Sequence, residues 1–122
     1  MVSVATQMNG CYRVGWCDAS AVMMRRLLET VIVEAFEANG IDSKIKDPRG
    51  EFFQLTDLVG AALNETAWNL SRNTKSSLPR LKSVGHLSAH SRRYNARRQD
   101  LDALVPDTRV VIEEFLHLAK LL

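Results

Sequence analysis

Apolar residues recur at every third or fourth position along most of this chain, the spacing that gathers side chains on one face of an α-helix. Asp18 suits the cap of a helix N-terminus, and Gly40 suits a left-handed stop after Asn39. No segment shows the sustained alternation of a β-strand. The sequence therefore predicts an all-α fold, and 122 residues fit one domain. Between Asp18 and Asn39 the repeat consists of Ala21, Met24, Leu28, Val31, Ala35 and Ala38.

A polar loop over 41–50 separates this helix from a second one. Glu51 to Asn64 is predicted to be helical, with Phe52 and Leu55 among the residues on its apolar face. We expect a further turn or two over 66–72, with Trp68 and Leu70 facing inward.

Two more helices are predicted in the last third of the chain. Asn73 to Ser77 is expected to be a turn, and Ser77 to cap a helix that has Pro79 in its first turn and ends near His90. After a polar link and one or two helical turns over 99–105, Pro106 is expected to open the last helix. Residues 18–122 then form a bundle of four or five helices, preceded by an arm or short helix over 1–17.

Basic residues are concentrated in one segment of the chain. Residues 66–99 hold eight of its 16 lysines and arginines and none of its 14 acidic residues. Such a segment indicates a place where phosphates bind. The alternative is a solvated face that pairs with the acidic remainder, within one chain or across a dimer. The eight are Arg72, Lys75, Arg80, Lys82, Arg92, Arg93, Arg97 and Arg98.

The composition gives no sign of secretion or membrane insertion. No apolar run approaches the roughly 18 residues of a membrane span, and residues 1–9 lack the charged start and apolar core of a signal peptide. Cys11 and Cys17 have no further thiols or histidines nearby at ligand spacing. We therefore expect reduced thiols, no metal or other cofactor, and a cytoplasmic protein.

The helix predicted to end at His90 holds the residues best suited to chemistry. On a helix Lys82, His86 and His90, each four residues apart, form one row. Two imidazoles that exchange protons near neutral pH, beside an ammonium group, make a cationic acid–base site. Gly85 lies among them although glycine is unfavourable in a helix by roughly 1 kcal/mol against alanine, which indicates a close approach by another backbone or a ligand.

This region resembles HEPN domains, the nucleotide-binding domains of higher eukaryotes and prokaryotes. The resemblance consists of a first helix with Arg25 and Glu29, a late helix reading VGHLSAHS, a basic link and a closing amphipathic helix. It covers about 18–122 in order of elements, and its most specific part is Gly85 to His90. More narrowly, the chain resembles uncharacterised bacterial HEPN-like domains attached to restriction or other defence proteins.

The resemblance implies an all-helical bundle that commonly dimerises. In ribonuclease members, a motif of arginine, a polar residue, spacers and histidine is shared across the dimer cleft. It promotes attack of an RNA 2′-hydroxyl on the adjacent phosphate without a metal. By position, His90 matches the motif histidine and His86 the polar residue, whereas Gly85 stands at the arginine position. The candidate ligands for phosphate or RNA are Lys82, Arg92, Arg93, Arg97 and Arg98.

Other roles remain open for the same residues. Two histidines four apart can bind a metal, but Leu87 stands where zinc-protease helices have a glutamate. His90 can equally be a buried or helix-terminal histidine, stabilised by the negative end of the helix dipole. Arg25 and Glu29 can form a buried pair that positions the His90 helix, or a surface pair worth a few tenths of a kcal/mol.

Two functions therefore remain in view. The first is a nucleic-acid-associated domain, RNA-binding or a metal-independent ribonuclease in bacterial defence, and the acid-free segment favours it. The second is a non-catalytic dimerisation or scaffold domain of a larger defence or restriction protein, which Gly85 at the arginine position favours.

Overall fold

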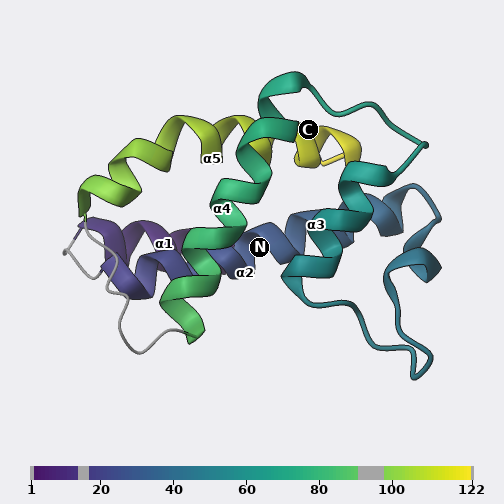
Figure 1. Ribbon diagram of the computed structural model, residues 1–122, viewed down its shortest axis with the longest axis horizontal. Coiled ribbons are helices and arrows are strands. Elements are labelled where there is room, and N and C mark those ends of the chain that lie inside the picture. The colour runs from purple at the N-terminus through teal and green to yellow at the C-terminus, as the bar shows by residue number, and fades with distance from the viewer. Residues whose placement is uncertain (1, 14–16, 91–97, 122) are drawn as a thin grey trace.

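Five α-helices form the described part of the chain, which in this computed structural model is residues 2–13, 17–90 and 98–121, with side chains described over 4–10, 19–83 and 102–121. No strand occurs in these ranges, only an isolated bridge between Lys46 and Phe52. The prediction of an all-α fold of four or five helices is confirmed (Figure 1). The elements are α1 (Val2–Arg13), α2 (Cys17–Ala38), the 3₁₀ turn η1 (Asp42–Ile45), α3 (Leu55–Asn64), α4 (Arg72–His90) and α5 (Arg98–Leu118).

Helix α2 is the central element, because α1, α3, α4 and α5 all pack on it. Its observed bounds match the predicted helix closely. The predicted apolar stripe is buried except for Ala38, which is half-buried, and Leu27, Ile32 and Phe36 widen it. That width lets helices pack on α2 from several sides, with α1 beside it and α4 running steeply across it (Figure 1).

The N-terminal segment is a helix rather than an extended arm. Helix α1 has 12 residues and packs along α2. Val4 is buried, and the Ser20 hydroxyl of α2 donates a hydrogen bond to the Met8 carbonyl at 3.1 Å.

The second predicted helix starts later than expected, at Leu55 rather than Glu51. A turn occupies the preceding residues, because the Asp47 carboxylate accepts the N–H groups of Arg49 and Glu51 at 2.9 and 3.0 Å and Gly50 adopts a φ of +85°. Phe52 is consequently not on the helix face, and 42% of it is exposed.

Residues 65–71 are not helical, so the expected extension of α3 is wrong, but Trp68 and Leu70 are buried as predicted. The Trp68 indole donates to the Ala62 carbonyl at 3.2 Å. Its ring meets Phe36 and Phe115 edge-on, at centroid distances of 4.9 and 6.4 Å. This connection is therefore part of the core.

The turn predicted over 73–77 is wrong, since α4 is already helical from Arg72. Ser71, not Ser77, caps it: the Ser71 Oγ accepts the Thr74 N–H at 3.2 Å. Ser77 is buried inside the helix, and Pro79 lies in its interior rather than in its first turn. The helix is described as far as His90, the residue near which the sequence predicted its end.

The last helix is likewise longer than predicted. Helix α5 begins at Arg98 and continues through Pro106, which does not open it. Asp107, which follows this proline, therefore lies well inside the helix. Val111 and Phe115 of the same helix are fully buried. The Asn39 side chain, just after α2, donates to the Leu118 carbonyl at 2.9 Å and fastens the far end of α5.

Candidate functional site

The site predicted from the sequence lies on α4. Because one unbroken helix spans Arg72–His90, the backbone positions of Lys82, His86 and His90 fall in one row along it. Extended toward the N-terminus, the same row takes in Lys75 and Arg72. The side chains of His86 and His90 lie outside the described part, so the row is established by helical register.

The buried face of α4 fixes how the described cations of this row are oriented relative to the core. Thr74, Ser77, Leu78 and Leu81 are buried against the core. Since each residue advances about 100°, Lys82 lies about a quarter-turn from the centre of that face, and Lys75 and Arg72 lie farther round the helix, away from the core. Their burial agrees with these positions: Arg72 and Lys75 are exposed, and Lys82 is half-buried.

Ion pairing leaves most of this positive charge available. Arg80, on the opposite flank, pairs with Asp107 of α5 at 3.1 Å. Within the described residues, Arg72, Lys75 and Lys82 form no ion pair. Among the described residues, no carboxylate therefore competes with an anion for these three cations.

Several predicted residues cannot be placed. Arg92, Arg93 and Arg97 lie outside the described residues. Arg98 is the first residue of α5, and Gly85 lies within α4, but neither side-chain environment is described. Among the predicted phosphate ligands, Lys82 is the one whose surroundings the structure gives.

Arg25 and Glu29 do pair, at 3.4 Å between guanidinium nitrogen and carboxylate oxygen. Their side chains are 18% and 29% exposed, between the buried and surface alternatives. Arg25 also donates to the side chain of Gln54, which precedes α3, at 3.4 Å. The described contacts of the pair thus join α2 to α3.

Among the described residues, two carboxylates have a pKa below the usual range, and neither belongs to the α4 row. The backbone N–H of Ala67 is the main cause for Glu65, whose pKa it lowers against desolvation, with help from Lys44. A hydrogen bond from Lys46 lowers the pKa of Asp42.

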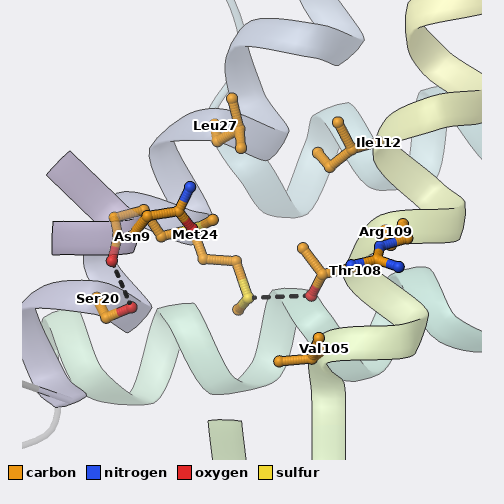
Figure 2. A pocket seen from close by; sticks show the side chains of 9 residues that line it. Asn9, Ser20, Met24, Leu27, Val105, Thr108, Arg109 and Ile112 are labelled. Atoms are coloured by element: carbon orange, nitrogen blue, oxygen red, sulfur yellow. Dashed lines mark hydrogen bonds between the residues drawn. The ribbon is translucent and has the colours of Figure 1, made fainter. Parts of the chain in front are cut away.

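The structure also contains a pocket that sequence reasoning missed. It lies between α1, α2 and α5, with a volume of about 330 Å³ (Figure 2). Met8, Met24 and Thr108 are among its lining residues. No sequence signal identifies it, because the residues come from distant segments and each alone is an ordinary helix residue.

The described residues contain neither a cluster of metal ligands nor a membrane-spanning helix. Among the described residues, no three histidine, cysteine or acidic side chains lie together as metal ligands would. Nor does any described helix combine the length and apolar character needed to cross a membrane.

Comparison with known proteins returns no match to this chain, whether against family models, curated proteins or solved structures.

Proposed function

We propose that this chain is a nucleic-acid-associated helical domain that contacts RNA through α4. The observation that carries the proposal is the row on this helix: Arg72, Lys75, Lys82, His86 and His90 share one flank of a single unbroken helix. Phosphates along a nucleic-acid strand are bound by such lines of cations, because each neutralised phosphate releases condensed counterions.

The HEPN resemblance extends this proposal to chemistry. In that case His90 transfers the proton as an RNA 2′-hydroxyl attacks the adjacent phosphate, a role that an imidazole near neutral pKa performs well. Lys82, with Arg92 or Arg93, would hold the phosphate, and His86 would support them. Lysine supplies a point charge rather than the two-pronged contact of the arginine that Gly85 replaces.

The first experiment incubates the purified domain with labelled single-stranded RNA in excess EDTA. The wild type is compared with His90→Ala, with Lys82→Gln, and with Arg49→Gln as a control for loss of an exposed positive charge elsewhere. We expect cleavage that survives EDTA and disappears in His90→Ala. Lys82→Gln should weaken binding and lower the salt slope by about one, because it removes one phosphate contact.

A specific observation keeps one alternative function in view. Gly85 stands at the position of the motif arginine, which favours a non-catalytic dimerisation or scaffold domain of a larger defence protein. A scaffold binds RNA no better than its charge predicts, loses binding steeply as salt rises, and is indifferent to His90→Ala. Equal loss of binding in Lys82→Gln and Arg49→Gln, without cleavage, would contradict an RNA site on α4.

A further inference from the structure

Helices α1 and α5 both pack on α2, and a hollow remains between them (Figure 2). Its described lining comes from these three helices and not from α4, so it is separate from the proposed RNA site. At about 330 Å³ it lies within the range of small-molecule pockets, roughly 300–1,000 Å³.

The walls of this pocket are mainly apolar. Met24 and Leu27 come from α2, Met8 from α1, and Val105 and Ile112 from α5. Val105 is 43% exposed, so apolar surface is open to solvent on the α5 side. Methionine side chains are flexible and polarisable, and two of them let the walls adapt to a ligand.

Among the described residues that line the pocket, Arg109 is the one with a charged side chain. The hydroxyl of Thr108 donates to the Leu104 carbonyl at 2.8 Å, and that of Ser20 donates to the Met8 carbonyl at 3.1 Å. Each hydroxyl has only one proton, so neither donates to a ligand while these bonds persist. Arg109 is exposed and, within the described residues, forms no ion pair.

We propose that this pocket binds an amphipathic monoanion, specifically an unbranched carboxylate of about ten carbons. Its tail lies against the apolar walls, and its carboxylate pairs with the Arg109 guanidinium, whose planar fork matches a carboxylate. The volume fits this length: one water takes about 30 Å³ of liquid, so the pocket holds roughly ten groups of that size.

The test uses the methionine methyl groups as reporters. The chain has four methionines, of which Met8 and Met24 line the pocket and the half-buried Met23 does not. With ¹³C-methyl methionine labelling, the protein is titrated with decanoate below its micelle concentration. We expect saturable shifts of the Met8 and Met24 methyl resonances and little change at Met23. Decyltrimethylammonium, with the same tail and the opposite charge, should bind more weakly.

Two variants test the assigned contacts. Arg109→Gln should weaken decanoate binding about fivefold, the effect of one partly exposed ion pair, while the matched Arg49→Gln leaves it unchanged. Val105→Trp replaces an exposed side chain with a larger one, and it should obstruct the pocket and abolish the shifts without lowering the melting temperature.

Three results would overturn the proposal. Shifts that grow linearly without saturation show only weak partitioning of an apolar tail. Unchanged decanoate affinity in Arg109→Gln or Val105→Trp places any binding elsewhere. Shifts of Met8 and Met24 on concentrating the protein alone show that a second copy of the chain occupies the pocket.

Discussion

At the scale of single residues, Glu65 organises the end of α3 and the start of the connection to α4. One carboxylate oxygen accepts the N–H groups of Thr66 and Ala67 at 2.9 and 3.0 Å and also the Lys44 ammonium at 3.1 Å. The Glu65 side chain is only 5% exposed. These bonds favour the ionised carboxylate, which explains the lowered pKa.

Glu65→Gln should therefore change how stability depends on pH. Because the folded-state pKa lies below the unfolded value near 4.5, the ionised group stabilises the fold fully above that value, and its contribution disappears as pH falls through the folded pKa. We expect the wild type to be more stable than the variant at pH 7, and the gap to be smaller at pH 3, because acid removes the ionised form that the fold stabilises. Urea unfolding at both pH values measures the two free energies.

Asp42 does not affect this comparison. Its pKa is lowered in both the wild type and the variant, so its contribution cancels in the difference between their free energies of unfolding. Exposed Glu37, which has no ion pair in the described part of the chain, supplies the matched control Glu37→Gln. A gap that stays constant with pH would show that Glu65 acts through shape and not through charge.

At the scale of helices, the start of α4 is set by Ser71. Its hydroxyl accepts the Thr74 N–H at 3.2 Å, while its own N–H donates to the Glu114 carboxylate of α5 at 2.7 Å. The same residue thus caps one helix through its side chain and links it to another through its backbone N–H. This start places the positive row in register from Arg72 onward.

Ser71→Ala should lower the free energy of unfolding by about 1 kcal/mol, the usual cost of losing an N-cap. Ser76→Ala is the control, since Ser76 is exposed inside the same helix and alanine is the better helix former there. Chemical denaturation followed by circular dichroism measures both. Equal stability of the two variants would mean that the hydroxyl contributes nothing as a cap.

The same helix shows what the sequence could and could not predict. The α2 stripe followed from apolar spacing, which tertiary packing only reinforces. The start of α4 did not follow from the sequence, because both Ser71 and Ser77 are acceptable caps and the contact with Glu114, 43 positions away, favours Ser71. The positions of two prolines were also predicted wrongly. Proline usually marks the first turn of a helix, but Pro79 and Pro106 are interior residues of long helices.

Local residue spacing was sufficient to predict the row on α4 but gave no information about the pocket. The row of Lys82, His86 and His90 follows from helical register alone. The pocket does not, because residues from α1, α2 and α5 meet there only after the bundle packs. Arg109 stands out through its place at that pocket and not through any motif.

At the scale of the whole molecule, Trp68 connects parts of the core that are distant in sequence. Its ring contacts Phe36 of α2 and Phe115 of α5, and both phenylalanines are fully buried. The indole N–H is bonded to the end of α3 at Ala62. The connection between α3 and α4 is thereby packed into the bundle, and the position of α4 depends on it.

Trp68→Phe should therefore destabilise the bundle as a unit. The variant leaves a void between Phe36 and Phe115 and removes the hydrogen bond to Ala62, for a combined cost of about 2 kcal/mol. Phe52→Leu is the control, because Phe52 is 42% exposed and surface substitutions usually change stability by less than about 0.5 kcal/mol. In urea, far-ultraviolet circular dichroism and the methionine methyl signals should shift to one common, lower midpoint in Trp68→Phe, since the ring joins α2, α3 and α5 in one core. Separate midpoints for the two probes would show instead that the connection unfolds independently, and that Trp68 packs on the bundle without holding it together.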